Sequence, residues 1–279
     1  AQGKVHLVDL KSLKVTKSWA AGHSPMGPVV SPDGKTLYVC NRFEHNVVVF
    51  DLVSQKKTAK IKVSREPIAA AITADGKTLF VVNQLPPGAA DGAYSAAVVS
   101  VIDTTANRVV ESIGLPNGSS SLQDICISPD GQHAYVTHIL SRYQLPTTQL
   151  ERGWMNTNAV SVIDLKAASW VNTVLLDEID RGAANPWGIA CTSDGKTLCV
   201  AHAGTHEVSI IDRTDLHRKL ADVEAGKAVT VVSDRPENVP NDLAFLVGSR
   251  ERIPLGGNGA RSITVVGTTA VIGMYFTDQ

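Results

Sequence analysis

One phrase recurs along the chain, and this internal repeat limits the fold more than any other feature. Its clearest copy is residues 31–51, SPDGKTLYVCNRFEHNVVVFD. Each copy contains an Asp-Gly pair and a later strand that ends on aspartate. The Asp-Gly pairs begin at Asp33, Asp75, Asp130 and Asp194, and the strands end at Asp51, Asp103, Asp164 and Asp212. A short unit repeated in this way cannot bury its own apolar face, so neighbouring units must stack against one another.

Each repeat reads as four short strands, here called A to D. In the second repeat, strand A is residues 67–73, B is 79–83, C is 98–103 and D is 108–115. The runs are rich in Val and Ile and bounded by turn residues, as strands are. Asp-Gly suits the tight hairpin between A and B, and no segment shows helical periodicity over about 12 residues. The repeat therefore predicts an all-β protein, a β-propeller of four-stranded antiparallel blades.

Four blades are complete, from about Met26 to Val223, and incomplete blades stand at both ends. The fourth blade has the weakest D strand, which we assign to residues 218–223, RKLADV. The chain opens with a C and a D strand and closes with an A and a B strand, at residues 4–10, 14–20, 260–267 and 270–276. Either the two halves combine into a fifth blade that closes the ring, or a longer propeller has been cut at both ends. We favour truncation.

Composition excludes several classes of partner and cofactor. The formal net charge is −1, which gives no electrostatic reason to expect nucleic acid. No apolar run approaches the roughly 20 residues of a membrane-spanning helix. The four cysteines form no Cys-x-x-Cys-His motif, so we expect no cofactor, covalent haem included, within this chain. Cys191 and Cys199 flank one hairpin turn, which leaves a disulfide between them open, although small buried thiols are the simpler interpretation.

Strand order assigns the loops to two faces. In an up-and-down blade, A–B and C–D turns lie on one face, and B–C loops and D–A links lie on the other. Every A–B turn here is a minimal Asp-Gly hairpin, whereas the long insertions are B–C loops or D–A links, including a D–A link from Glu224 to about Gly259. Long loops on a rigid scaffold commonly carry function. We therefore expect the working site on the loop face, near the channel mouth of the third and fourth blades.

That face is rich in arginine, tryptophan, amides and histidine, which together can hold carboxylates, phosphates or sugars. The candidate ligand-binding residues are His138, Arg142, Arg152, Trp154, Asn156, Asn158, Asp180, Arg181, Asn185, Trp187, His202, His206, Asn241, Asp242, Arg250 and Arg261. We expect His138 and His202 to line the inner rim. The competing interpretation is that these side chains fasten the loops, with arginines clamping loop carbonyls and carboxylates such as Asp177 and Asp180.

Catalytic and metal-binding interpretations have less support. There is no Gly-x-Ser-x-Gly elbow, no phosphate-binding Gly-rich loop and no recognisable triad order, so we assign no catalytic residue. His138, His202 and His206 with Asp180 or Asp242 could form a metal site. Local hydrogen bonding explains these histidines more simply, and we predict no metal. In a hydrolase, Asp180, Asp242 and His202 would be the acid–base candidates.

The phrase PDGKTLYV…N…VVVFD resembles the YVTN family of bacterial β-propeller repeats, which occur in surface-layer and other extracytoplasmic proteins. The loop segments 142–164, 180–212 and 241–263 are similar to propellers that precede a di-haem c-type cytochrome of the peroxidase (MauG-like) class. That resemblance implies a seven-bladed propeller, of which residues 1–279 would be one truncated domain. It also implies a periplasmic or cell-surface location, and a cytochrome/peroxidase domain with its haem outside this chain.

Two functions follow as hypotheses. The first is a non-catalytic scaffold within a larger redox protein, which binds its c-type cytochrome/peroxidase domain or a small polar anionic ligand. The second is a propeller hydrolase of the lactonase type with a divalent cation, since lactonases with related repeats place acidic, His and Arg residues over the central channel. Fold alone does not choose between them.

Overall fold

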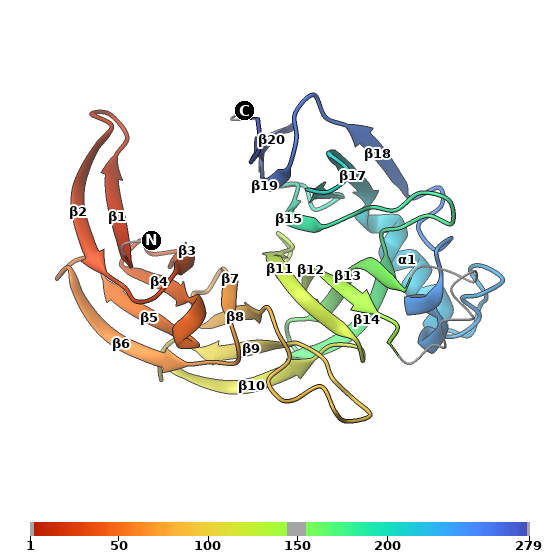
Figure 1. The fold of residues 1–279 in the computed structure, drawn as a ribbon, viewed down its shortest axis with the longest axis horizontal. Coiled ribbons are helices and arrows are strands. Elements are labelled where there is room, and N and C mark those ends of the chain that lie inside the picture. The colour runs from red at the N-terminus through yellow and green to blue at the C-terminus, as the bar shows by residue number, and fades with distance from the viewer. Residues whose placement is uncertain (1–2, 144–154, 278–279) are drawn as a thin grey trace.

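The computed structural model describes residues 3–143 and 155–277. Within these residues the strands form six antiparallel sheets, four with four strands and two with two. The sheets follow one another around an arc, each packed against the next (Figure 1). The predicted all-β propeller architecture is confirmed. No helix in the described ranges is long and apolar enough to span a bilayer.

The four complete blades are simple meanders in which each strand pairs with its neighbour in the chain. The first blade comprises β3 (Pro25–Val30), β4 (Thr36–Asn41), β5 (Asn46–Asp51) and β6 (Lys56–Lys62), and the second comprises β7 (Pro67–Ile72), β8 (Thr78–Asn83), β9 (Val98–Asp103) and β10 (Arg108–Gly114). The third comprises β11 (Ser119–Ile127), β12 (His133–Ser141), β13 (Asn156–Asp164) and β14 (Ser169–Leu175), and the fourth comprises β15 (Pro186–Cys191), β16 (Thr197–His202), β17 (Glu207–Asp212) and β18 (Arg250–Pro254).

The Asp-Gly turns have the same construction in all four blades. In the second blade, Oδ1 of Asp75 accepts hydrogen bonds from the Thr73 hydroxyl at 2.6 Å and from the Lys77 amide at 3.0 Å. Gly76 follows with a φ of 71°, a left-handed value that a side chain would strain. The turn thus needs both residues, which explains why the pair recurs.

The core lies between the blades rather than within any one of them. The Val, Ile and Phe side chains of the B and C strands are buried, as Phe80, Val99 and Val136 illustrate in the contact between the second and third blades. Adjacent A strands also pack side by side along the inner edge of the arc. Because the strands are apolar on both faces, each blade depends on its neighbours for burial.

The fourth blade departs from the prediction, because its residues 218–223 are helical rather than a D strand. They belong to α1 (Arg213–Glu224), which buries Leu216, Leu220 and Val223. These residues recur at helical spacing, and Asp212 caps the first turn by accepting a hydrogen bond from the Asp215 amide at 2.9 Å. The repeat order predicts a strand here, but the helical spacing of the apolar residues and the Asp212 cap determine the local structure.

The true D strand is β18, which pairs with β17 after a long insertion. Residues 213–249 are therefore a C–D connection, and only residues 255–259 form the D–A link that we predicted from Glu224. Within the insertion, the short 3-10 helix η3 (Pro236–Asn241) packs against β14. Asn241 and Asp242 consequently belong to a C–D insertion and not to the D–A loops of the predicted working face.

Helix α1 is joined to the third blade by a polar contact. The buried Tyr135 hydroxyl lies 2.6 Å from Nε2 of His217 and accepts a hydrogen bond from Nε of Arg213 at 2.5 Å. Arg213 also forms an ion pair with Asp130 at 2.7 Å. The Asp-Gly turn of the third blade is thus tied to the insertion of the fourth.

The chain ends form two separate half-blades. β1 (Lys4–Asp9) pairs with β2 (Lys14–Ala20), and β19 (Ala260–Val266) pairs with β20 (Thr269–Met274). In the described residues no ladder joins these two sheets, and Figure 1 shows them on opposite sides of a gap. The alternative of closure into five blades is therefore not realised in this structure.

The cysteines are free thiols. Cys191 lies opposite Leu198 and Cys199 lies opposite Ala190 in the β15–β16 ladder. Neighbouring positions on paired strands face opposite sides of a sheet. The hairpin therefore does not bring the two sulfur atoms face to face.

Candidate functional site

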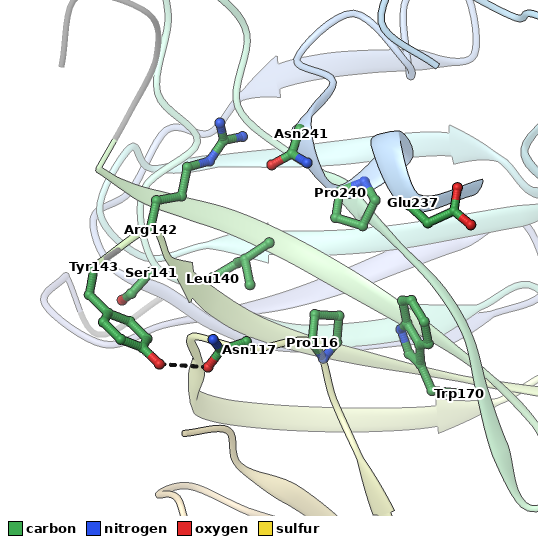
Figure 2. A pocket seen from close by; sticks show the side chains of 10 residues that line it. All are labelled: Pro116, Asn117, Leu140, Ser141, Arg142, Tyr143, Trp170, Glu237, Pro240 and Asn241. Atoms are coloured by element: carbon green, nitrogen blue, oxygen red, sulfur yellow. Dashed lines mark hydrogen bonds between the residues drawn. The ribbon is translucent and has the colours of Figure 1, made fainter. Parts of the chain in front are cut away.

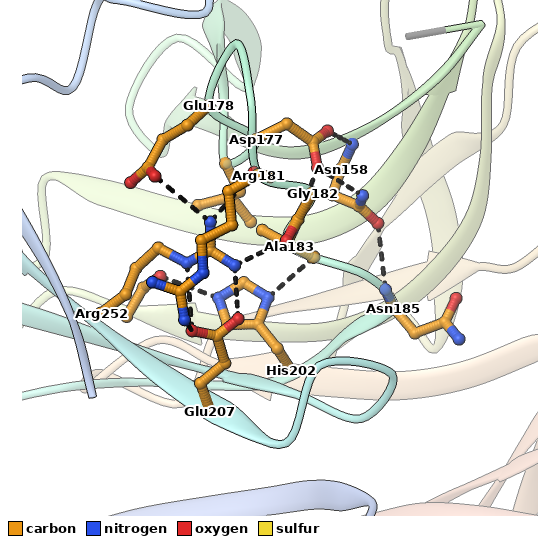
Figure 3. A network of polar contacts seen from close by, with 12 residues as sticks. Asn158, Asp177, Glu178, Arg181, Gly182, Ala183, Asn185, His202, Glu207 and Arg252 are labelled. Atoms are coloured by element: carbon orange, nitrogen blue, oxygen red, sulfur yellow. Dashed lines mark hydrogen bonds and ion pairs between the residues drawn. The ribbon is translucent and has the colours of Figure 1, made fainter. Parts of the chain in front are cut away.

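A network of polar contacts fastens the D–A link between the third and fourth blades (Figure 3). At its centre, the buried Asp177 carboxylate accepts hydrogen bonds from the backbone and side-chain amides of Asn158, at 2.6 and 2.9 Å, and from the Ala183 amide at 2.6 Å. Asn158 in turn accepts a hydrogen bond from the Asn185 amide at 3.0 Å. These bonds fold the link back against β13, so Asn158 and Asn185 hold the loop in place.

His202 belongs to the same network and is fully buried at the end of β16. Its Nδ1 lies 3.0 Å from the Ala183 carbonyl oxygen and its Nε2 lies 2.8 Å from the Ser209 hydroxyl. Because a carbonyl oxygen can only accept, Nδ1 carries the proton and Nε2 accepts from Ser209. Burial lowers the His202 pKa to about 4, so the ring is neutral near pH 7.

Arginines clamp the opposite side of this link. Arg181 pairs with Glu207 at 2.7 Å, and Arg252 also pairs with Glu207 while donating to the carbonyl oxygens of Arg181 and Gly182 at 3.0 and 2.6 Å. Burial opposes ionisation of Glu207, but the hydrogen bonds from Arg252 and Thr205 and the charges of Arg252 and Arg181 together outweigh it and lower the Glu207 pKa. These arginines act as loop clamps, with Glu207 as the acid rather than Asp177 or Asp180.

Arg250 lies two residues before Arg252 on the same face of β18 and has the same role. Its guanidinium donates to the Leu176 carbonyl oxygen and pairs with Glu178 at 2.7 Å. Its side chain is almost completely buried. Arg250 therefore joins β18 to the end of the third blade and has little surface left for a ligand.

The other two histidines are also satisfied locally. His138 is fully buried, with Nε2 2.8 Å from the Ser161 hydroxyl and Nδ1 3.1 Å from the Ile139 carbonyl oxygen. His206 accepts a hydrogen bond from the Gly259 amide at 3.0 Å. His138 and His202 thus lie inside their blades and not on the inner rim, which corrects our expectation. Within residues 3–143 and 155–277, no three His, Cys, Asp or Glu side chains are grouped to hold a metal ion.

The remaining candidates lie in different environments. Asn156 is exposed and accepts a hydrogen bond from the Ser141 hydroxyl at 2.8 Å. Asp180 is exposed on the D–A link, whereas Asp242 is buried and organises the insertion by accepting from the Ser233 hydroxyl at 2.6 Å. Arg152 and Trp154 lie outside the described residues. The structure does not bring Asp180, Asp242 and His202 together as an acid–base set.

A groove of about 400 Å³ lies beside this network (Figure 2). It is bounded by the link between the second and third blades, the end of β12, the start of β14, and η3. The lining residues are Pro116, Asn117, Leu140, Ser141, Arg142, Tyr143, Trp170, Glu237, Pro240 and Asn241. Two sequence candidates, Arg142 and Asn241, meet here, although they come from different blades.

Arg142 gives the groove its chemistry. Its Nε and Nη2 atoms are buried and have no hydrogen-bond acceptor among the described residues. Burial lowers the Arg142 pKa, but an arginine stays charged at any physiological pH. Leu140 and Trp170 supply apolar wall, and the Tyr143 hydroxyl donates to Asn117 at 2.7 Å. The nearby Asp177 carboxylate favours the charged form of Arg142. An apolar groove with a few polar groups, one of them a cation, is the usual form of a binding site for a small organic molecule.

Sequence reasoning missed Glu207 and Arg252, which carry the clamp. A signal for Arg252 existed, since Arg250 and Arg252 alternate with period two, as residues on one face of a strand do. The repeat order places residues 250–254 in a D–A link, where such alternation carries no meaning, whereas they form β18. Glu207 follows the predicted turn at His206, and nothing local marks its burial.

The fold and its loop network define the chain as a β-propeller repeat protein. No protein-family model matches it. A solved chain of hydrazine synthase from Kuenenia stuttgartiensis is similar in structure, with a TM-score of 0.66 and 25% sequence identity over 99% of this chain and 88% of that chain. Hydrazine synthase subunit beta of the same organism is 37% identical over 114 residues, which span 41% of this chain and only 29% of the subunit. The resemblance to YVTN repeats and to MauG-linked propellers stays a prediction.

Proposed function

We propose that this chain is a non-catalytic docking scaffold within a larger extracytoplasmic redox assembly. Its similarity to a protein named as a subunit of a synthase supports a role beside other polypeptides. The partner expected from the sequence resemblance is a c-type cytochrome or peroxidase domain, which would carry the haem. The periplasmic or cell-surface location is part of the same proposal.

The observation that carries this proposal is a contrast in hydrogen bonding. Polar side chains in the loop network are bonded to the protein itself, whereas Arg142 at the groove has donors without acceptors among the described residues. Asp177 and His202 of the network are buried and hydrogen-bonded to the loop backbone, which supports a structural role for them. Arg142 instead lies at a groove, and its Nε and Nη2 have no acceptor among residues 3–143 and 155–277. A cation held in a rigid frame with free N–H donors can bind a partner's carboxylate by charge-assisted hydrogen bonds.

The test is to isolate the tagged chain from its own organism and to analyse the complex by size-exclusion chromatography with haem staining. We expect stoichiometric co-elution with a haem-bearing polypeptide at a mass well above 29.6 kDa. Arg142→Met should weaken the association about tenfold or more through loss of a charge-assisted contact. Arg108→Met, at the exposed start of β10, is the matched control. A chain that elutes alone, or an unaffected Arg142→Met complex, would contradict the proposal.

No specific observation favours the lactonase alternative. His202 is buried and hydrogen-bonded on both ring nitrogens, and Asp242 lies in the C–D insertion. An assay of simple aliphatic and aromatic lactones with added Ca²⁺ or Mg²⁺ should show no hydrolysis above the uncatalysed rate. A rate that disappears in Asp180→Asn would restore the hydrolase hypothesis.

A further inference from the structure

We propose a second anion-binding site, for a carboxylate on an apolar group, at Arg261 on the inner strand β19. It is defined by Arg261, Trp187, Tyr275 and Phe276 and is independent of the groove and of the proposed function. Trp187 is on the neighbouring inner strand β15, and the other two aromatic residues directly follow β20. The site is therefore built by the fourth blade and the C-terminal half-blade together.

Three rings surround the Arg261 guanidinium. Its Cζ lies 3.7 Å from the ring centroid of Tyr275, 4.5 Å from that of Trp187 and 5.5 Å from that of Phe276. All three are within cation–π range. A planar guanidinium held by rings loses little further conformational entropy when it binds a ligand, so the donor group is already oriented.

The backbone beneath the rings is also fixed. Gly259 has a φ of 76°, and a Cβ at this position would come within 2.5 Å of the Phe276 ring. The Gly259 amide donates to His206 at 3.0 Å, and the Tyr275 amide donates to the Gly259 carbonyl oxygen at 2.9 Å. Close packing that only glycine permits therefore holds the aromatic wall against Arg261.

No counter-ion of Arg261 lies among the residues that the structure describes. Within them its side chain forms no ion pair or hydrogen bond, and its Nε is buried without an acceptor. Arg213, Arg250 and Arg252 each pair with a carboxylate. Aromatic faces stabilise the charge but accept hydrogen bonds only weakly, so the donors of Arg261 are left for a ligand.

A carboxylate fits these donors best. Its two oxygen atoms match two parallel N–H groups of a guanidinium. Tyr275 and Phe276 are 59% and 64% exposed as residues, so an apolar substituent on the acid can cover their side chains. The combination favours a carboxylate with an adjoining hydrophobic group over a small inorganic anion.

The test is a titration of the whole chain with phenylacetate, followed by the Arg261 Nε–H signal in 1H–15N NMR. That signal is assigned by its absence in Arg261→Lys. We expect a saturable shift with phenylacetate, at least about tenfold weaker binding of acetate, and no saturable shift with neutral phenylacetamide. Saturation by inorganic phosphate as strong as by phenylacetate, or equal binding of phenylacetamide, would overturn the assignment.

Variants separate the charge from the rings. Arg261→Lys and Arg261→Met should weaken phenylacetate binding, measured by calorimetry, by about tenfold or more, with the larger loss in Arg261→Met. Trp187→Phe keeps the cation and should give an intermediate loss. Arg108→Met is the control and should bind normally. If Arg261→Met fails to fold, Arg261→Lys decides, and wild-type affinity in that variant overturns the bidentate site.

Discussion

At the residue scale, the clamp at Glu207 shows how buried charge can be structural. Arg252 and Glu207 are 3% and 1% exposed, whereas Arg181, on the same acid, is 50% exposed. Arg252→Met should remove the buried donor of the clamp, which leaves the Glu207 carboxylate with only the half-exposed Arg181 as ion-pair partner and takes away the hydrogen bond to the Gly182 carbonyl oxygen. We expect a loss of about 3 kcal/mol in the free energy of unfolding, measured by urea titration. Arg181→Met should cost much less, because a half-exposed ion pair is screened by solvent. Equal losses would contradict this view of the clamp.

Buried histidines predict a defined pH dependence of stability. Burial lowers the pKa of both His138 and His202 to about 4, below their ordinary value of 6.5. Between these two pH values the unfolded chain binds protons that the folded chain does not. The free energy of unfolding should therefore fall as the pH drops from 6.5 to 4, by up to roughly 3 kcal/mol per histidine. His202→Asn should make this slope shallower in thermal melts across the range.

Asp124 on β11 acts in the opposite sense. Burial raises its pKa from 3.8 to about 6, so the folded chain holds a proton that the unfolded chain releases between these values. Protonated Asp124 therefore adds to the free energy of unfolding at low pH, and this contribution is lost as the pH rises through 6. Asp124→Asn should therefore steepen the acid loss of stability that His202→Asn reduces. The same slope in both variants would show that these groups do not control the acid transition.

At the element scale, α1 anchors the insertion through one buried lysine. Nζ of Lys219 donates to the carbonyl oxygens of Phe245 and Val247 at 2.9 and 2.8 Å and lies 3.5 Å from Asp215. Lys219→Met keeps the apolar length but removes these donors, so we expect a loss of roughly 1–3 kcal/mol in urea unfolding. Lys227→Met, in an exposed position, is the control and should be nearly neutral. An unchanged Lys219→Met would mean that apolar packing alone holds the insertion.

The elements that could be predicted are those in which local chemistry and repeat order agree. The strands of the first three blades follow from Asp-Gly turns and Val-rich runs, because each signal is contained within a few residues. The fourth blade was mispredicted after β17, where α1 interrupts the order and β18 follows far along the chain. Arg142 and Asn241 were both candidates, but their meeting in one groove depends on that misplaced insertion. Arg252 was missed for the same reason.

At the scale of the whole molecule, the arc predicts a gradient of local stability. The middle blades have neighbours on both sides. In the described part of the chain the β1–β2 sheet packs on the first blade alone, and most of its side chains are exposed. In stacked repeats, stability is approximately the sum of unit and interface contributions, so a two-stranded sheet with one interface is the least stable unit. Amide hydrogen exchange should therefore be fastest in β1–β2 and β19–β20 and slowest in β8 and β12. Uniform protection across the blades would instead indicate one cooperative unit.

The long connection between β17 and β18 has a consequence for the order of folding. In the first blade only residues 52–55 separate the C and D strands, whereas residues 213–249 separate them in the fourth. Loop-closure entropy rises with the logarithm of length, which adds roughly 2 kcal/mol for a flexible connection of this size. The β17–β18 ladder is thus a pairing of high contact order in a molecule dominated by local ones. We expect β18 to join its sheet late, after α1 has packed and shortened the span that the chain must cross.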